Sequence, residues 1–243
     1  GGTLLAVSAN VLNQIFEIET DRLMERTANR PLVTGEINKK SAYVYSISLG
    51  LVGFLVLYTQ TTELAAFIAL SANIFYSFIY TLVLKPRTNQ NIVIGGAAGA
   101  APVLIGWSAT GTNLDTGSWL LFLLVFLWTP AHFWALSIDK LNDYKDANFP
   151  MLPTQESYKR TSIFIGIYSC ATVLTSLLLA PILQLGMVYL LLSLIFGLYL
   201  MYKSYQLYRK QIKAISYFVF SNTYLAVIFL SMVADIFITL SSI

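Results

Sequence analysis

Long apolar stretches separated by short polar connections dominate this sequence, and they restrict the chain to one class of fold. We count eight such stretches, of which the first, near residues 1–16, is partial or short. The others lie near residues 42–60, 63–84, 92–110, 117–138, 161–182, 185–203 and 215–241. A helix that crosses a lipid bilayer needs about 20 predominantly apolar residues. We therefore expect an all-α protein, a polytopic bundle of transmembrane helices. Because the sequence starts without Met and is hydrophobic at once, we also expect it to begin inside a helix.

The composition excludes several other classes of protein. Hydrophobic residues make up 56% of the 243 residues and charged residues only 11%, whereas soluble domains usually carry about 25% charge. A soluble fold of this composition would leave too much apolar surface in water. The net charge of +3 is too small to indicate a nucleic-acid partner. The single cysteine, Cys170, excludes an intrachain disulfide, and we expect it to be a small buried residue.

The basic residues indicate how the chain is oriented in the membrane. In an alternating topology, all 15 Lys and Arg residues fall on one side. They are Arg22, Arg26, Arg30, Lys39, Lys40, Lys85, Arg87, Lys140, Lys145, Lys159, Arg160, Lys203, Arg209, Lys210 and Lys213. The opposite side holds only Glu63 and Asp115, while Asp235 lies inside the last stretch. By the positive-inside rule, the basic side faces the cytoplasm, or the matrix of a mitochondrion.

Two acidic clusters lie at the basic ends of two different apolar stretches. Asn13, Glu17 and Asp21 are spaced at i, i+4 and i+8, so they form one stripe on a helix with steps of roughly 6 Å. Asp139 and Asp143 repeat the i, i+4 spacing at the end of the fifth stretch. The two clusters therefore occupy equivalent places on two helices.

Carboxylates that face each other repel unless cations bridge them. Mg²⁺ typically binds one or two carboxylates and completes its shell with water and substrate phosphates. Neighbouring Arg and Lys side chains can hold the remaining phosphate oxygens. The pattern thus predicts a metal–diphosphate site at the membrane face, where charge stabilisation helps a diphosphate leave an attached carbon.

Two other interpretations of these charges stay open. Helix ends at a membrane surface are normally charged, and i, i+4 ion pairs there contribute little to stability. A transporter would place ionisable groups near the bilayer midplane instead. The interiors of the apolar stretches are nearly free of charge, which argues against transport.

Four segments carry a resemblance to a known family. They are NQIFEIETDRLMERTANRPL (13–32), LKPRTNQNIVIGGAAGAAPVLIGW (84–107), WTPAHFWALSI (128–138) and DYKDANFPMLP (143–153). Together they resemble the UbiA superfamily of intramembrane prenyltransferases, and within it the branch that farnesylates haem B. The motifs cover about residues 1–160, and hydropathy alone carries the resemblance beyond them. That family folds as nine transmembrane helices around a cavity, so the resemblance implies one transmembrane prenyltransferase domain over residues 1–243 that lacks the first helix.

The resemblance also implies an activity. It is the Mg²⁺-dependent transfer of a farnesyl group from farnesyl diphosphate to a vinyl group of haem B, after which water adds to give haem O. The implied location is the inner membrane of a bacterium or a mitochondrion, with the active site on the cytoplasmic or matrix side. Haem A synthase and terminal oxidase assembly are the implied partners. The alternatives are a UbiA-type enzyme that prenylates an aromatic quinone precursor, and a non-enzymatic transporter or haem-handling protein.

By resemblance, the acidic clusters correspond to the family's two metal-binding motifs. The residues expected to be catalytic and to bind the metal are Asn13, Glu17, Asp21, Asp139 and Asp143. Those expected to bind diphosphate or the haem propionates are Arg22, Arg26, Arg30, Lys85, Arg87, Lys140, Tyr144 and His132. His132 is the only histidine, and a hydrogen-bonded core residue is the alternative to a role near the porphyrin or in proton transfer.

This sequence departs from the family's pattern at four positions. Glu17 stands where many members have Asp, and its longer side chain still reaches a metal. Asp139 stands where the haem branch is often not acidic. Ala131 replaces the second proline of a TPPHF motif, and Pro86 replaces a basic residue, which removes one candidate cation.

Overall fold

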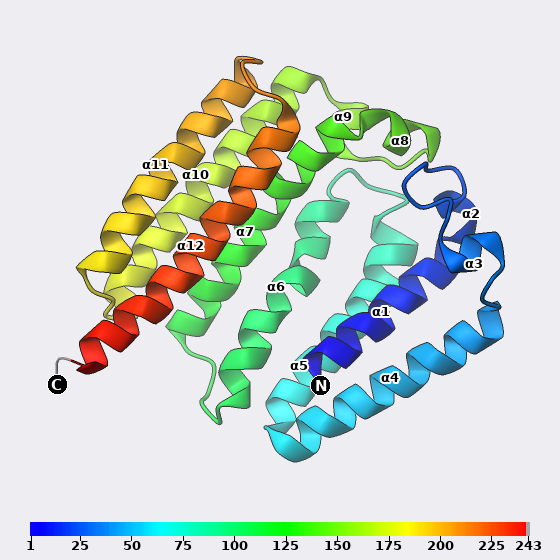
Figure 1. The fold of residues 1–243 in the computed structure, drawn as a ribbon, viewed down its shortest axis with the longest axis horizontal. Coiled ribbons are helices and arrows are strands. Elements are labelled where there is room, and N and C mark those ends of the chain that lie inside the picture. Colours follow the sequence, from blue (N-terminus) through cyan, green and yellow to red (C-terminus); the bar gives the residue numbers. More distant parts are fainter. Residues whose placement is uncertain (242–243) are drawn as a thin grey trace. The chain divides into compact units, whose positions relative to one another are not determined.

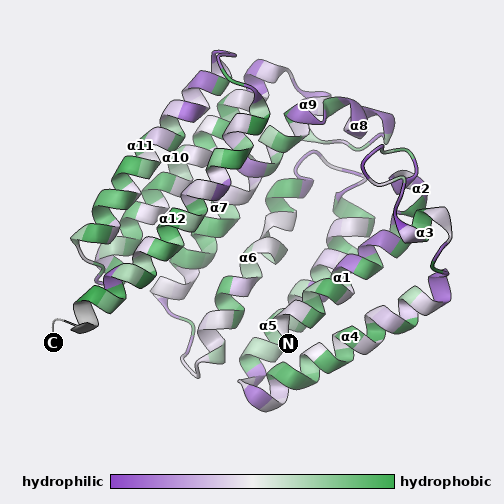
Figure 2. Ribbon diagram, viewed as in Figure 1, coloured by the Kyte–Doolittle hydropathy of each residue, from purple (hydrophilic) through white to green (hydrophobic). Residues whose placement is uncertain are grey.

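A computed structural model describes the backbone of residues 1–241 and the side chains of residues 1–238. All regular elements in this part of the chain are helices, so the expected all-α fold is confirmed. Hydrophobic residues make up much of each long helix, and hydrophilic residues gather mainly at the helix ends and connections (Figure 2).

Seven helices in the described chain are long and apolar enough to cross a membrane. They are α4 (Lys39–Gln60), α5 with η1 (Glu63–Ile74 and Phe75–Leu84), α6 (Asn91–Ala109), α7 (Thr116–Asp139), α10 (Tyr158–Ile182), α11 (Met187–Tyr208) and α12 (Ala214–Ser241). The predicted count of eight is wrong by one, because the first stretch forms a shorter helix, α1 (Gly2–Phe16), of 15 residues. The chain is a multi-pass membrane protein.

The helices are divided between two compact units, coloured along the chain in Figure 1. The first unit consists of Gly1–Leu114 and Lys140–Gln155. Besides α1, α4, α5, η1 and α6 it contains four short helices, namely α2 (Ile18–Asp21), α3 (Pro31–Thr34), α8 (Leu141–Asp146) and α9 (Leu152–Gln155). The second unit consists of Asp115–Asp139 and the chain from Glu156 onward, and it contains α7, α10, α11 and α12.

Small residues allow close helix packing in the first unit. A Cβ added at Gly53 of α4 would lie 3.0 Å from the Cβ of Leu4 on α1. A Cβ added at Gly95 of α6 would lie 2.4 Å from the ring of Tyr80 on η1. Small side chains let helix backbones approach closely in a membrane, where apolar surfaces alone do not drive helices together.

The second half of the α5–η1 span is a π-helix. The Lys85 backbone N–H donates to the carbonyl of Tyr80, five residues earlier, at 2.8 Å. The Thr81 hydroxyl likewise donates to the carbonyl of Tyr76 at 2.9 Å. Such wide turns occur frequently at functional sites. This one carries Thr81, which contacts Asn13, and it ends at Lys85, which contacts Glu17.

Hydroxyl groups join three helices of the second unit. Ser176 of α10 accepts from Tyr224 of α12 at its hydroxyl (2.8 Å) and from Tyr189 of α11 at its carbonyl (2.7 Å). These contacts bury tyrosine hydroxyls together with their hydrogen-bond partners, as membrane helices require. Cys170 of α10 is exposed, so the prediction that it is buried is wrong.

A carboxylate inside the last span also has a structural role. Asp235 of α12 is only 4% exposed. It accepts hydrogen bonds from the backbone N–H groups of Gly186 and of Tyr189, the latter at 3.4 Å. These groups begin α11, whose first N–H groups lack partners within the helix. Asp235 therefore caps α11 from a neighbouring helix.

Candidate functional site

The predicted acidic stripe lies at the end of α1 and is buried. Asn13, Glu17 and Asp21 are 7%, 6% and 4% exposed. The helix is interrupted at Glu17, which separates α1 from α2 and has φ −103° and ψ 12°. The Asp21 N–H nevertheless donates to the Glu17 carbonyl at 2.7 Å. The chain thus keeps a helical path through the interruption, and all three side chains stay on the buried side.

Glu17 is paired with a lysine from the π-helical span. The Lys85 Nζ lies 2.6 Å from the Glu17 carboxylate and donates a hydrogen bond to Oε2. Lys85 Nζ also lies 4.6 Å from the centre of the Phe149 ring, within the range of a cation–π contact. The ammonium is therefore held between a carboxylate and an aromatic face.

Asp21 is paired with an arginine from its own connection. Arg30 Nη1 donates to Asp21 Oδ2 at 2.5 Å. The Thr27 hydroxyl donates to the Asp21 carbonyl at 2.8 Å, which folds the intervening loop back onto the helix end. The Asp21 side chain is 5% exposed and that of Arg30 is 31% exposed, so the arginine connects the buried carboxylate to the surface.

Three contacts between α1 and the α5–η1 span share a sequence offset of 68 residues. They are the hydrogen bonds from Asn73 to the Leu5 carbonyl (2.7 Å) and from Asn13 to the Thr81 hydroxyl (3.1 Å), and the ion pair of Glu17 with Lys85. A constant offset means that the two helices run parallel and keep one register. Asn13 on α1 and Glu17 at its end therefore each meet a partner at the matching position of the other span.

Sequence reasoning missed Thr81 and Phe149 as partners of the candidate site. A signal for the first was present in the sequence. Polar residues recur at every fourth position of an otherwise apolar span, namely Asn73, Ser77, Thr81 and Lys85. This spacing places them on one helix face. No comparable pattern marks Phe149, which lies in the connection after α8.

The second acidic motif is divided between the units. Asp143 and Tyr144 lie on α8 in the first unit, whereas Asp139 is the last residue of α7 in the second unit. Tyr144 is buried, and the Arg26 guanidinium lies 5.7 Å from the centre of its ring. Asp143 is half-buried, and its carboxylate makes no ion pair within the described part of the chain.

Asn91 connects the segment after α8 to the membrane helices of the first unit. Its amide Nδ2 donates to the carbonyls of Thr88 at 2.7 Å and Pro150 at 3.5 Å. Asn91 is fully buried. This contact fixes the segment that carries Phe149 beside Lys85.

The other predicted cations lie at the surface. Arg22 makes an exposed ion pair with Glu19 at 3.2 Å. Arg87 is exposed and donates to the Leu82 carbonyl at 3.5 Å. Lys140 is exposed as well. Of the predicted cations, Lys85 and Arg30 are thus the ones in contact with the buried carboxylates.

His132 lies in the second unit and is buried between aromatic rings. Its ring is stacked on Trp128 at 4.2 Å and on Phe218 at 4.1 Å between ring centres. His132 Nδ1 lies 2.7 Å from the hydroxyl of Ser221, which itself donates to the Phe218 carbonyl at 2.7 Å. A hydroxyl has one proton to donate, so the Ser221 oxygen accepts from Nδ1–H of His132. Sequence reasoning missed Ser221 as its partner.

The donor chemistry of the stripe suits a hard cation. Among the described residues, no group of three or more His, Cys, Asp or Glu side chains is arranged to hold a metal. Mg²⁺ does not require one, because one or two carboxylates suffice when water and phosphate oxygens complete its shell. Glu17 and Asp21 supply carboxylate oxygens. Asn13 donates a hydrogen bond to Thr81 through Nδ2, which leaves its amide oxygen as a third metal ligand.

Comparison with known proteins gives consistent similarities. A model of the UbiA prenyltransferase family matches residues 1–233. A protein named protoheme IX farnesyltransferase from Clavibacter sepedonicus is 42% identical over 97% of this chain and 78% of its own length. One of the same name from Thermus thermophilus is also 42% identical over 97% of this chain, but the chain spans only 39% of its length.

Solved structures show the same fold at low sequence identity. A digeranylgeranylglyceryl phosphate synthase aligns with a TM-score of 0.74 and 22% identity, over 96% of this chain and 81% of its own. A UbiA homolog from Archaeoglobus fulgidus, bound to GPP and Mg²⁺, aligns with a TM-score of 0.65 and 17% identity, over 95% and 87%. These likenesses show the fold alone.

Proposed function

Because the chain belongs to the UbiA prenyltransferase family, we propose that it transfers a farnesyl group from farnesyl diphosphate to a vinyl group of haem B, which yields haem O. The observation that carries the proposal is the pair of buried carboxylates, Glu17 and Asp21, each in contact with a cation at one end of the first unit. The choice of haem B is supported by the names of the relatives at 42% identity.

The residues of the stripe fit a magnesium ion. Glu17, Asp21 and Asn13 are the side chains that would hold it, together with water and the diphosphate of the substrate. When bound, the ion would supply positive charge that stabilises the departing diphosphate. A UbiA homolog of the same fold is described as bound to GPP and Mg²⁺, which supports this assignment.

Lys85 and Arg30 would bind the diphosphate oxygens. Both cations already lie beside the carboxylates, so their positive charge is present where the leaving group accumulates negative charge. Arginine can donate two parallel hydrogen bonds to a phosphate group, whereas lysine acts as a compact charge. Arg26 and Tyr144 contact each other within the first unit and are further candidates for the diphosphate.

The reaction breaks the bond between the farnesyl C1 carbon and the diphosphate oxygen, and the diphosphate leaves with the electron pair. The vinyl group of haem B then forms a new carbon–carbon bond with the farnesyl carbon. Water adds to the resulting cationic centre and loses one proton, which gives the hydroxyethylfarnesyl side chain. In this scheme the protein binds the leaving group and holds its charge.

The remaining assignments belong to the same proposal. Asp139 and Asp143 form the second metal-binding motif, and His132, Arg22, Arg87 and Lys140 bind the haem or the diphosphate. The two units act as a single prenyltransferase domain, which is supported by one family model that matches residues 1–233. The site faces the cytoplasm or the matrix across an inner membrane, as the position of the basic residues supports. Haem O then passes to haem A synthase or to terminal oxidase assembly.

An acceptor comparison tests the proposal. Membranes that contain the chain are incubated with labelled farnesyl diphosphate and either haem B or 4-hydroxybenzoate, with Mg²⁺ or with EDTA. We expect labelled haem O only with haem B and Mg²⁺, measured by chromatography of extracted haems. Label in 4-hydroxybenzoate alone would reassign the acceptor to an aromatic quinone precursor. Absence of diphosphate release with both acceptors would refute the transferase activity.

A further inference from the structure

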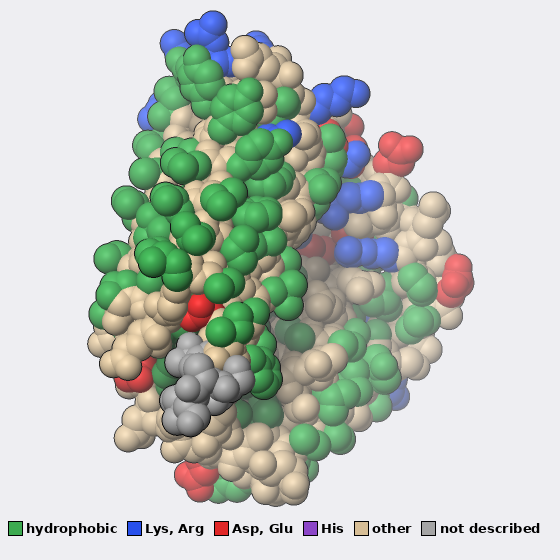
Figure 3. Space-filling view, turned by 60° about the vertical axis from the view of Figure 1, so that its left-hand side comes forward, with side chains coloured by type: hydrophobic (Ala, Val, Ile, Leu, Met, Phe, Trp, Pro, Cys, Tyr) green, Lys and Arg blue, Asp and Glu red, His purple; other side chains and the backbone are tan. Residues whose placement is uncertain are grey.

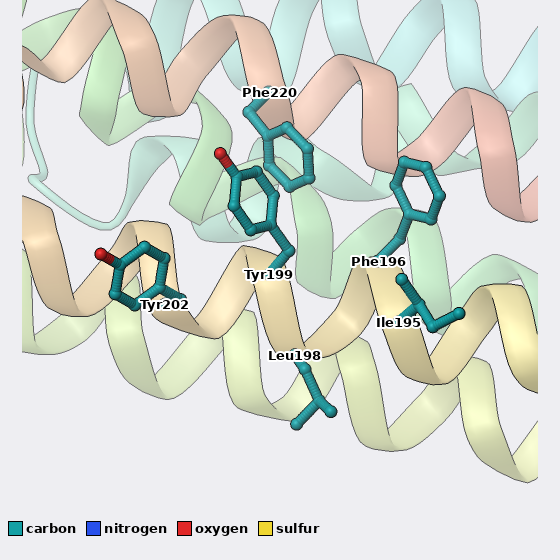
Figure 4. Close-up of a pocket in the computed structure, with 6 residues that line it drawn as sticks. All are labelled: Ile195, Phe196, Leu198, Tyr199, Tyr202 and Phe220. Carbon is teal, nitrogen blue, oxygen red and sulfur yellow. The ribbon is translucent and has the colours of Figure 1, made fainter.

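A groove lies on the surface of the second unit, between α11 and α12. It has a volume of about 530 Å³. Its lining is Ile195, Phe196, Leu198, Tyr199, Tyr202 and Phe220 (Figure 4). Apart from the two tyrosine hydroxyls, these side chains are apolar, and most of them belong to one helix. The groove is therefore suited to a hydrocarbon chain rather than to a polar ligand.

Aromatic rings form the floor of the groove. Tyr199 of α11 packs edge-on against Phe220 of α12, with 4.6 Å between ring centres. Phe196 lies nearly parallel to Phe220 at 6.3 Å. Leu198 and Tyr202 at the rim are 62% and 52% exposed. Because α11 is a membrane-spanning helix, this exposed face meets lipid.

A lysine lies at one end of the groove. Ile195, Tyr199 and Lys203 follow at i, i+4 and i+8, so they share one face of α11. Lys203 Nζ lies 5.5 Å from the centre of the Tyr199 ring and 3.5 Å from the hydroxyl of Ser216 on α12. The ammonium thus lies between the two helices, one helical turn beyond the groove's aromatic floor.

This end of the second unit carries more basic than acidic residues. Three further basic residues follow Lys203 at the connection between α11 and α12, namely Arg209, Lys210 and Lys213. Residues 157–234 contain no Asp or Glu. Glu156, just before this range, is paired with Arg160 at 3.1 Å. In Figure 3 the Lys and Arg side chains gather at one end of the hydrophobic face of this unit.

We propose that this groove is a binding site for one anionic phospholipid, which places an acyl chain along the aromatic floor and its phosphate at Lys203. A zwitterionic lipid carries its own cation and gains less from the basic cluster. Anionic headgroups are attracted to basic residues at the membrane face, and tyrosines are typical of that depth. The inference does not rest on the proposed enzymatic function.

Native mass spectrometry of the detergent-solubilised chain tests the proposal. The probes are dioleoyl phosphatidylglycerol and dioleoyl phosphatidylcholine, which have the same acyl chains. We expect one high-affinity phosphatidylglycerol, with phosphatidylcholine bound at least about fivefold more weakly, the factor that corresponds to one basic residue at the membrane surface. Equal affinities for the two lipids would overturn the proposal.

Three variants locate the site. Lys203→Gln should weaken phosphatidylglycerol binding about fivefold, whereas Lys39→Gln, which removes an exposed lysine of the first unit, should leave it unchanged. Ile195→Trp should fill the groove and weaken binding of both lipids. Equal losses in Lys203→Gln and Lys39→Gln would contradict the location. A chain that dimerises through this face, with lipid excluded in the dimer, would show that the occupant is a second copy.

Discussion

Glu17 in the first unit and Asp235 in the second are both buried carboxylates on apolar helices, but their charges are balanced differently. Glu17 contacts the ammonium of Lys85, a long side chain from another helix. Asp235 accepts hydrogen bonds from backbone N–H groups at the start of α11. A side chain can move and exchange partners, whereas a helix terminus is fixed by its own hydrogen bonds. The first arrangement is suited to a reaction and the second to a stable fold.

The largest effect is expected from Asp21→Ala. Removal of this carboxylate deletes a metal ligand, and the loss of several kcal/mol of charge stabilisation should lower the rate of haem O formation at least ~1000-fold. The unfolding temperature should change little, because Arg30 is already part-exposed and can turn to water. Product chromatography and thermal unfolding in detergent measure the two quantities.

A matched carboxylate in the same connection is the control for Asp21→Ala. Glu25 is exposed, so Glu25→Ala should keep both the rate and the unfolding temperature. If Asp21→Ala forms product at the wild-type rate, the metal assignment is wrong. Asp143→Ala should lose activity in the same way, since we place it in the second motif.

The next effect concerns stability. Glu17→Gln leaves Lys85 with a buried, unbalanced charge, which should cost about 3 kcal/mol in the free energy of unfolding. A second change, Lys85→Met, should recover most of that loss, because it removes the buried ammonium and leaves neither side chain charged. Activity should stay low in both variants. Unfolding in mixed micelles measures the free energies.

The double variant tests whether the unbalanced lysine causes the loss of stability. If Glu17→Gln with Lys85→Met is no more stable than Glu17→Gln alone, the loss does not come from an unbalanced lysine. The ion pair would then contribute to the fold in the way that Asp235 does, and the difference between the two carboxylates would disappear.

Asp235→Ala should show the opposite pattern. It removes the acceptor from the N–H groups of Gly186 and Tyr189, which should cost about 2 kcal/mol in the free energy of unfolding. The rate per folded molecule should stay near that of the wild type. Asp235→Asn keeps an acceptor oxygen and should lose less. A large drop in the rate for Asp235→Asn would assign this carboxylate to the reaction.

The smallest effect is expected at the hydrogen bond between Asn13 and Thr81. Thr81→Val keeps the shape of the side chain but removes the acceptor, which should cost about 1 kcal/mol of stability. Thr81→Ser retains the hydroxyl and should be close to the wild type. Thermal unfolding of both variants measures this difference, and equal unfolding temperatures would show that the bond adds nothing.

The helices and the acidic stripe could be predicted from the sequence because both depend on local spacing. Long apolar runs define the spans, and the i, i+4 spacing places Asn13, Glu17 and Asp21 on one face. Periodicity does not show which side chains from other helices contact these residues, however. The contacts of Glu17 with Lys85 and of His132 with Ser221 join residues 68 and 89 positions apart, and they depend on how helices pack.

The two wrong predictions, the count of eight spans and the burial of Cys170, have physical reasons as well. Hydropathy groups the first apolar stretch with the spans because it marks a segment as apolar but does not fix where its helix ends at Glu17. The expectation that Cys170 is buried follows from soluble proteins, whose apolar stretches bury their small residues. In a membrane helix, one face meets lipid, so an apolar sequence does not imply a buried side chain.

The shared offset of 68 residues between α1 and the α5–η1 span has a consequence for how the length of the chain can vary. An insertion in the loops between the two helices would change the offset but leave every contact in place. A single insertion or deletion between Leu5 and Glu17, or between Asn73 and Lys85, would instead separate Asn13 from Thr81 or Glu17 from Lys85. The number of residues in the wide turns of η1 thus sets which side chains meet across the two helices. A one-residue change there would disconnect the candidate site while leaving the span hydrophobic.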